Sequence, residues 1–153
     1  MYRLHWKPPD EWPWMLGFLQ ARAVVGVEII SETSYTRSFA LGEHRGIITA
    51  QPDEARGVMQ VTISDGLLPV ADRCLQHVSN LFDLSCNPQV VSEALGELGA
   101  ARPGLRLPGC MDPFEQAVRA ILGQLVSVAM AAKLTSRGVA LCGERFDGQF
   151  VLY

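Results

Sequence analysis

The chain has 153 residues, of which 48% are hydrophobic and 19% charged, and its formal net charge is −3. This composition can bury a core and excludes a disordered chain, and the acidic balance excludes a general basic surface for a polyanion. Nucleic-acid binding therefore requires a local site. No apolar stretch approaches the roughly 20 residues that span a bilayer, and residues 1–12 lack the apolar segment of a signal peptide. We expect a cytoplasmic protein without membrane contact.

Short strands are predicted throughout the first 63 residues. Residues 1–6 alternate apolar and polar side chains, as a half-buried strand does, and Pro8 and Pro9 end this strand. AVVGVEII (23–30) is expected to be a strand or extended chain, and three more segments are expected to be strands: YTRSFAL (35–41), RGIITA (45–50) and GVMQVTI (57–63). Turns are expected at residues 42–43 and 52–54. The short connections favour antiparallel pairing.

Two amphipathic helices accompany these strands. The first follows Asp10, which can cap it, and Pro13 fits its first turn. The second lies within DGLLPVADRCLQHVSNLFDL (65–84), where apolar residues recur every three or four positions: Leu67, Val70, Cys74, Val78, Leu81 and Phe82. This order of elements predicts an α+β domain over residues 1–88, an antiparallel sheet with helices packed on one face.

A helix and a loop follow over residues 89–111. Asn87 and Pro88 start the helix as its cap and first residue, and the loop holds three glycines and two prolines. This loop is the expected domain boundary. Past it, Asp112 can cap another helix that begins at Pro113, and the Glu115 carboxylate can bond back to the cap amide.

The helix that begins near Asp112 ends in an unusual sequence, GQLV. Its apolar face holds Phe114, Val118, Ile121 and Leu122, and Gly123 suits the position just after a helix end. Ser127 can cap the next helix, which leaves residues 124–126 as a tight exposed turn. Leu125 in this turn has two interpretations. It is either a hydrophobic staple between the helices or an apolar wedge inserted between DNA base steps.

Metal and cofactor chemistry is not indicated. The cysteines show no C-x-x-C spacing and form no metal-ligand pattern with the histidines: Cys74, Cys86, Cys110, Cys142, His5, His44 and His77. Reduced thiols are therefore favoured over a disulfide framework. We expect no metal, no cofactor and no catalytic pair of side chains.

Three blocks of sequence carry a resemblance to a known family: MYRLHWKPPDEWPWMLGFLQARA, FDLSCNP and LRLPGCMDPFEQAVRAILGQLVSVAMAAKLTSR. On these blocks the chain, up to about Asp147, resembles the bacterial inducible 3-methyladenine DNA glycosylases of the helix-hairpin-helix superfamily. The resemblance implies that residues 1–88 are similar to half of a TATA-binding-protein fold. It implies that residues 112–147 are the first helices of an all-α glycosylase domain. Residues 148–153 do not match the family.

The resemblance also implies a function and a site. Family members act in base-excision repair, where they flip alkylated bases such as 3-methyladenine out of damaged double-stranded DNA and remove them by hydrolysis. Leu125 matches the intercalating wedge, Gln124 its neighbour, and Phe18 an aromatic wall of the base pocket. Alkylation gives the base a positive charge, which weakens its glycosidic bond and favours stacking on electron-rich rings.

The family's helix-hairpin-helix and catalytic aspartate do not occur in these 153 residues. The parent protein is therefore expected to be the enzyme, and this chain alone is expected to be inactive and to self-associate through residues 112–142. A truncation, a shifted reading frame and a domain fragment are all open. The alternative function is a non-catalytic α+β binding module that shares the fold and does not require the wedge or Phe18.

Overall fold

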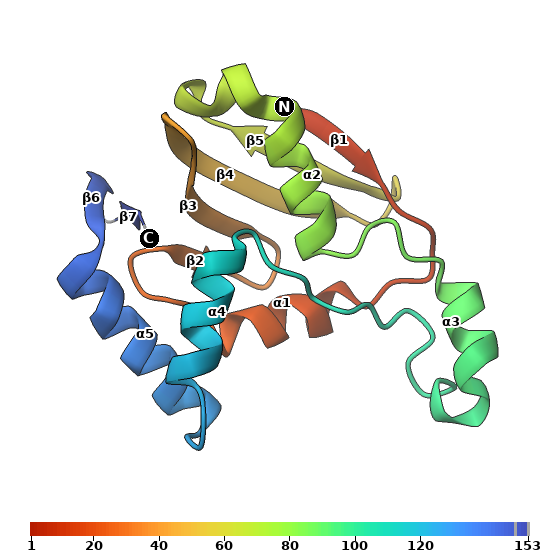
Figure 1. The fold of residues 1–153 in the computed structure, drawn as a ribbon. Coiled ribbons are helices and arrows are strands. Elements are labelled where there is room, and N and C mark those ends of the chain that lie inside the picture. The colour runs from red at the N-terminus through yellow and green to blue at the C-terminus, as the bar shows by residue number, and fades with distance from the viewer. Residues whose placement is uncertain (149, 153) are drawn as a thin grey trace.

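The computed structural model describes residues 1–148 and 150–152 (Figure 1). Its centre is a five-stranded antiparallel sheet in the order β1-β5-β4-β3-β2. The strands are β1 (Tyr2–His5), β2 (Glu28–Ile30), β3 (Tyr35–Leu41), β4 (His44–Asp53) and β5 (Val58–Ile63). The predicted α+β class with an antiparallel sheet is confirmed.

Helices α1 (Trp12–Gln20) and α2 (Ala71–Leu81), the latter preceded by the 3₁₀ helix η1 (Asp65–Val70), cover one face of this sheet (Figure 1). The pattern of β5 explains why. Met59, Val61 and Ile63 alternate with polar residues, so they share one face, where they are buried against the helices. The remaining helices are α3 (Pro88–Leu95) with the 3₁₀ helix η2 (Gly96–Leu98), α4 (Pro113–Leu122) and α5 (Val128–Cys142).

Several predicted boundaries in this unit are wrong. Asp10 does not cap α1: Glu11 holds the cap position, and the Asp10 carboxylate accepts a hydrogen bond from Trp6 Nε1 at 2.9 Å. Of residues 23–30, a strand forms over Glu28–Ile30, after a tight turn in which the amides of Val27 and Glu28 donate to Val24 O. The turn expected at residues 52–54 begins later, because β4 continues through Asp53.

Helix α3 starts at Pro88 as predicted, but the Asn87 side chain makes no capping hydrogen bond to the described helix. Its apolar side chains do not join the core. Val90, Val91, Leu95 and, in η2, Leu98 are exposed. In Figure 1, α3 projects from the body of the molecule at the end opposite α5.

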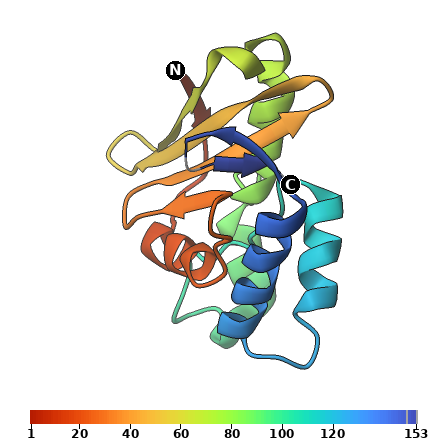
Figure 2. The same ribbon diagram turned by 90° about the vertical axis from the view of Figure 1, so that its left-hand side faces the viewer.

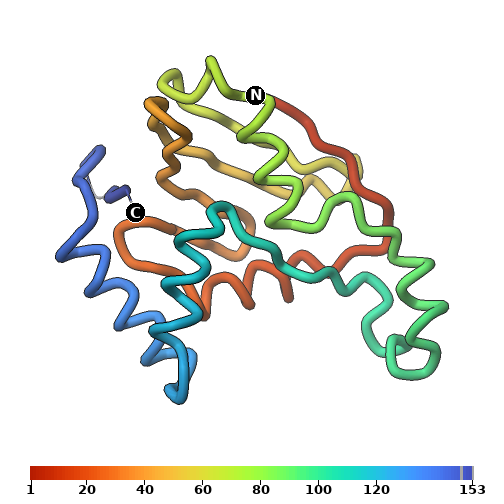
Figure 3. Tube along the Cα trace, in the orientation of Figure 1, coloured from red at the N-terminus to blue at the C-terminus, as the bar shows by residue number. Residues whose placement is uncertain are grey.

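The end of the described chain returns to the sheet. Strands β6 (Glu144–Asp147) and β7 (Phe150–Leu152) form a hairpin, in which Phe150 and Leu152 are buried. The Val151 amide donates to Gly26 O at 2.7 Å, so the tail lies beside the loop before β2 (Figure 3). Gln149 and Tyr153 of the predicted tail lie outside the described residues.

The helices of the structure bear on the expectation that the chain does not contact a membrane. Within residues 1–148 and 150–152, every helix is too short or too polar to cross a bilayer.

Candidate functional site

Helix α4 carries its polar side toward the sheet. Asp112 caps it as predicted, because Asp112 Oδ1 accepts a hydrogen bond from the Glu115 amide at 2.8 Å. The second half of the predicted capping box is wrong. The Glu115 carboxylate, in a residue only 3% exposed, turns away from the cap and accepts a hydrogen bond from Arg37 Nη2 at 2.6 Å. A long-range ion pair has replaced the local contact.

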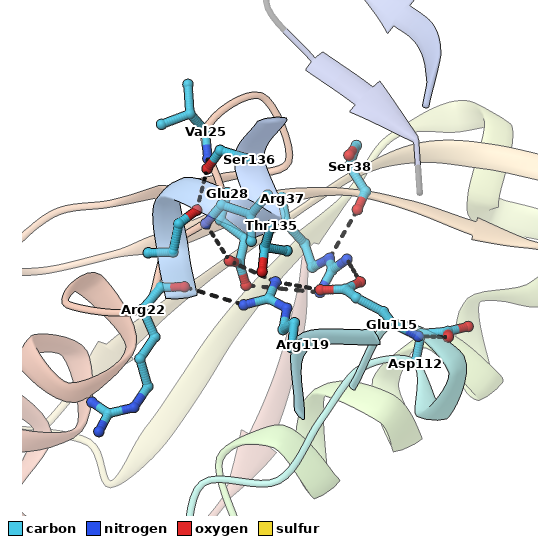
Figure 4. A network of polar contacts seen from close by, with 12 residues as sticks. Arg22, Val25, Glu28, Arg37, Ser38, Asp112, Glu115, Arg119, Thr135 and Ser136 are labelled. Carbon is cyan, nitrogen blue, oxygen red and sulfur yellow. Dashed lines mark hydrogen bonds and ion pairs between the residues drawn. The ribbon is translucent and has the colours of Figure 1, made fainter. Parts of the chain in front are cut away.

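Four charged side chains form a buried network at this junction (Figure 4). Glu28 on β2 lies opposite Arg37 on β3 in the strand register, and both side chains are almost fully buried. Arg119, one turn along α4 from Glu115, donates to Glu115 and, at 2.9 Å, to Glu28 Oε2. The Tyr35 hydroxyl donates to Glu28 Oε1 at 2.7 Å. The two glutamates are therefore neutralised by the two arginines.

The surroundings of Glu28 and Tyr35 determine their protonation states. Burial raises the pKa of Glu28, but the positive charges of Arg119 and Arg37 and the hydrogen bonds from Tyr35 and Arg119 outweigh burial and hold that pKa below its usual value. Burial also raises the pKa of Tyr35, so its hydroxyl stays protonated and donates. Glu28 is therefore an ionised structural acceptor and is not poised as a general acid.

A cavity of about 310 Å³ lies beside the network, between α1, α4, α5 and the loop before α4. Its walls come from Phe18 on α1, Arg22 in the turn after α1, the charged network, and small residues on α4, at its end and on α5: Ala120, Gly123, Ala131 and Ala132. The small side chains leave the space open. The cavity has the size and the mixed lining of a small-ligand site.

Phe18 stands in this cavity wall as a half-buried ring. The ring stacks on Trp14, with centroids 5.4 Å apart and an interplanar angle of 29°. The guanidinium carbon of Arg22 lies 3.6 Å from the centre of the Phe18 ring. Phe18 thus contacts an aromatic ring and a cation.

The α4–α5 turn lies at the end of the helix pair that points away from the sheet (Figure 2). Ser127 caps α5 as predicted, its hydroxyl accepting from the Met130 amide at 3.2 Å. Gly123 directly follows the end of α4, as predicted, with φ of −86°, and the left-handed conformation in this turn belongs to Leu125, whose φ is 60°. Gly123 is suited to its place by close packing. A Cβ there would lie 3.0 Å from Arg119 O and 3.5 Å from Ala131 Cβ.

Leu125 is fully exposed, and Gln124 beside it is exposed. Gly123 and Val126, on either side of these two residues, line the cavity. The turn therefore places Leu125 next to the cavity to which Phe18 contributes. All three predicted site residues lie around one feature, although Phe18 and Leu125 are separated by more than 100 positions in the sequence.

The sequence prediction missed the charged network and Arg22. One signal was present. In YTRSFAL, Arg37 shares the alternation of Tyr35 and Phe39, so a charged side chain was due on the covered face of the sheet. A buried arginine requires an acidic partner, but the spacing along the chain does not identify Glu115, which lies 78 positions away.

Among residues 1–148 and 150–152, no three His, Cys, Asp or Glu side chains gather closely enough to hold a metal ion.

Comparison with known proteins places the chain in a family. The AlkA N-terminal domain family matches residues 1–112. DNA-3-methyladenine glycosylase 2 of Escherichia coli (strain K12) is 65% identical over 147 residues, covering 96% of this chain and 52% of that protein. A probable bifunctional transcriptional activator/DNA repair enzyme AlkA of Mycobacterium tuberculosis is 34% identical over 150 residues, covering 92% of this chain and 29% of that protein.

The solved structure of the 3-methyladenine DNA-glycosylase from Archaeoglobus fulgidus is similar in fold, with a TM-score of 0.77 at 20% identity, over 99% of this chain and 55% of that one. The chain thus spans about half the length of the E. coli relative and less of the mycobacterial ones. The family match covers the whole sheet, both helices packed on it, and α3. This chain belongs to the AlkA N-terminal domain family.

Proposed function

We propose that this chain is the N-terminal part of a DNA-3-methyladenine glycosylase, which flips alkylated bases out of damaged double-stranded DNA and removes them by hydrolysis. The name of the E. coli relative, at 65% identity, supports this activity. The structural observation that carries the proposal is Leu125, a fully exposed leucine with φ of 60° beside a cavity. A large apolar side chain held in such a position is available to an external partner such as a base stack.

Leu125 is the wedge in this proposal. A hydrophobic staple buries its side chain between two helices, whereas the Leu125 side chain is exposed along its full length. An apolar side chain of this kind fills the gap that an extruded base leaves in the stack. Gln124, exposed beside it, is its neighbour at the DNA.

Phe18 is the aromatic wall of the base pocket in this proposal. The cavity beside the wedge receives the flipped base, and the Phe18 ring offers an electron-rich face to it. A positively charged alkylated base gains more from such a face than a neutral base does. The wedge and the pocket are thus parts of one site.

The chemistry of bond cleavage is proposed to come from the rest of the parent enzyme. An aspartate or glutamate that stabilises an oxocarbenium-like transition state must be free to face the sugar. Of the described carboxylates that line the cavity, Glu28 and Glu115 are bound to arginines and Asp112 caps α4. We therefore assign no catalytic residue to this chain and propose that it is inactive alone.

Further parts of the proposal concern organisation. We propose an α+β domain over residues 1–88, a connecting helix and loop over residues 89–111 that contain the domain boundary, and the start of the glycosylase domain over residues 112–147. Of the last segment, α4 and α5 are helices and Glu144–Asp147 is strand β6. A cytoplasmic location fits a DNA repair enzyme of bacterial type. Self-association through residues 112–142 is proposed because α4 and α5 expose apolar side chains, including Phe114 and Ile121.

A non-catalytic binding module is the second candidate function. The observation that favours it is the same engagement of the described carboxylates beside the cavity. Such a module does not need a wedge. The effect of Leu125 on DNA binding therefore separates the two functions.

The test is Leu125→Ala, with Leu141→Ala as a matched exposed leucine at the other end of α5. We expect Leu125→Ala to weaken binding to a duplex with an abasic-site analogue about ten-fold, since a buried leucine is worth roughly 1.5–3 kcal/mol and 1.4 kcal/mol is one decade. Leu141→Ala should leave binding unchanged, and both variants should melt as the wild type does. Unchanged DNA affinity with a stability loss above about 2 kcal/mol would identify a structural leucine.

A further inference from the structure

The Arg22 side chain lies over the ring that the base is proposed to use. Its guanidinium carbon is 3.6 Å from the Phe18 ring centroid, and its Nη1 donates to Phe18 O at 3.1 Å. Both side chains line the same cavity. Figure 4 shows the Arg22 side chain extending away from the buried charged network, which it joins through its backbone carbonyl alone in that view.

Arg22 differs from the other arginines of the cavity in its charge environment. Arg37 and Arg119 are held in ion pairs by Glu28 and Glu115. Within residues 1–148 and 150–152, no carboxylate lies within ion-pair distance of Arg22. Its half-exposed position lets water solvate the charge once the side chain turns outward. The Arg22 guanidinium is therefore held by the Phe18 ring and by its hydrogen bond to Phe18 O, without an ion pair among the described residues.

A guanidinium on a phenyl face and a cationic base on the same face use one interaction, the attraction of positive charge to the ring. The two cannot occupy that face together. Trp14 already stacks on Phe18, so the contact with Arg22 is the one that a ligand in the cavity meets. The free protein thus carries its own cation where the alkylated base would stack.

We propose that Arg22 is a displaceable cap on Phe18, which an N-alkylated, positively charged base must replace in order to enter the cavity. The inference rests on the proposed role of Phe18 as a base contact. The cap lowers the affinity of every base by a similar factor, so it acts as a threshold. Neutral, undamaged bases stack more weakly on the ring and are the first to fall below it. Arg22 thus lowers the occupancy of the cavity by weakly stacking bases, whereas the preference for a cationic base comes from the Phe18 ring.

The experiment is an NMR titration of the isotope-labelled chain with two nucleosides, in mildly acidic buffer. 7-Methylguanosine carries a positive charge there and guanosine is neutral. The variants are Arg22→Gln, Arg22→Lys, Phe18→Leu and, as a matched loss of charge on the far edge strand, Arg3→Gln. A first readout needs no ligand: the δ-methylene protons of Arg22 should be shifted upfield by the Phe18 ring, and this shift should vanish in Phe18→Leu.

We expect Arg22→Gln to tighten the binding of both nucleosides about three- to ten-fold, the range of a partly desolvated cation–π contact. 7-Methylguanosine should gain at least as much as guanosine, because the change also removes a like charge. Arg22→Lys should fall between wild type and Arg22→Gln, since a lysine lacks the planar group that covers the ring. Arg3→Gln should behave as the wild type.

Two groups of results would overturn the cap. An absent upfield shift, or binding that depends on Phe18 but is unchanged or weakened in Arg22→Gln, refutes the cap and leaves the base pocket standing. If neither nucleoside binds, or Phe18→Leu binds as well as wild type, the pocket assignment fails and the cap falls with it. The two failures are thus distinct.

Discussion

The sheet with α1 and α2 (the sheet unit) and the α4–α5 helix pair bury opposite kinds of side chain. In the sheet unit the buried side chains are large and apolar, among them Trp12, Tyr35, Ile48, Met59 and Phe82. In the helix pair the buried set is Glu115, Thr135 and Val139, whereas the exposed set includes Phe114, Ile121, Leu125, Met130 and Leu141. An amphipathic pattern therefore predicts that a helix forms, but not which side of it the rest of the molecule covers.

The cause lies in the sheet. Glu28 and Arg37 face the covered side of their strands and are 3.9 Å apart, so their remaining buried polar atoms require further hydrogen-bond partners. Glu115 and Arg119 on α4 supply them, spaced four residues apart so that they share one helix face. The polar face of α4 is thus fixed inward, and its apolar face is left to the outside.

The largest effect we expect concerns the cavity between the two regions. This chain, incubated with alkylated duplex DNA, should release 3-methyladenine at least 10²–10³-fold more slowly than the E. coli relative, the loss expected for even one missing electrostatic contact to the transition state. The described carboxylates beside the cavity are all engaged in ion pairs or in the α4 cap. Chromatography of released bases measures the rate, and release near that of the relative would refute the assignment.

The next effect tests whether the charged network holds the helix pair on the sheet. Glu115→Ala leaves Arg37 and Arg119 buried without one partner, so we expect a loss of about 3–5 kcal/mol in the free energy of unfolding. That loss overlaps the cost of a core truncation such as Ile48→Ala in the sheet unit, about 2–5 kcal/mol. Urea unfolding followed by circular dichroism gives both values.

Arg56→Ala is the control for this test, because the Arg56 side chain is exposed in its pair with Asp53, so we expect its loss to cost less than about 1 kcal/mol. The double change Arg37→Met with Glu115→Leu should recover much of the loss, since an apolar pair of similar volume replaces a buried ion pair well. A cost below about 1 kcal/mol for Glu115→Ala would show that the network does not hold the helix.

The two regions also differ in how far the sequence predicted them. The strand over Tyr35–Leu41 was predicted to the residue, and the caps Asp112 and Ser127 were predicted correctly, because alternation and capping are local patterns. The ion pair between Glu115 and Arg37 was not predicted, because Arg37 lies in a distant strand and its contact replaces the local capping contact of Glu115. The hairpin of β6 and β7 was missed for the same reason: its docking depends on the loop at Gly26.

The candidate site was predicted in part. Phe18, Gln124 and Leu125 came from a resemblance to a family, and their common location around one cavity emerged from the fold. The contact between Arg22 and Phe18 had no signal in the sequence beyond the four-residue spacing, which many surface pairs share.

A smaller effect concerns the exposed face of the helix pair. We expect the wild-type chain to self-associate in sedimentation experiments over a concentration series, and Phe114→Ser with Ile121→Ser to weaken this association ten-fold or more, since each side chain is worth roughly 1.5–3 kcal/mol when buried. Leu98→Ser, an exposed apolar residue in η2, is the control and should leave the association unchanged. A strictly monomeric wild type would contradict the proposed self-association.

The smallest effect we expect is the stability cost of the Leu125 backbone conformation. Leu125 has φ of 60°, a left-handed conformation that costs an L-residue roughly 1–2 kcal/mol. A glycine variant removes this cost, but part of the gain is lost because glycine has a greater entropy in the unfolded chain. Leu125→Gly should therefore be about 0.5 kcal/mol more stable than Leu125→Ala, which keeps the Cβ and its strain. Both should bind the abasic-site duplex equally poorly. Calorimetric melting gives the difference. If glycine brings no gain, the turn is unstrained and its shape follows from close packing at Gly123. If it does, the chain retains a strained leucine where glycine is more stable, which is expected where the side chain serves an external partner.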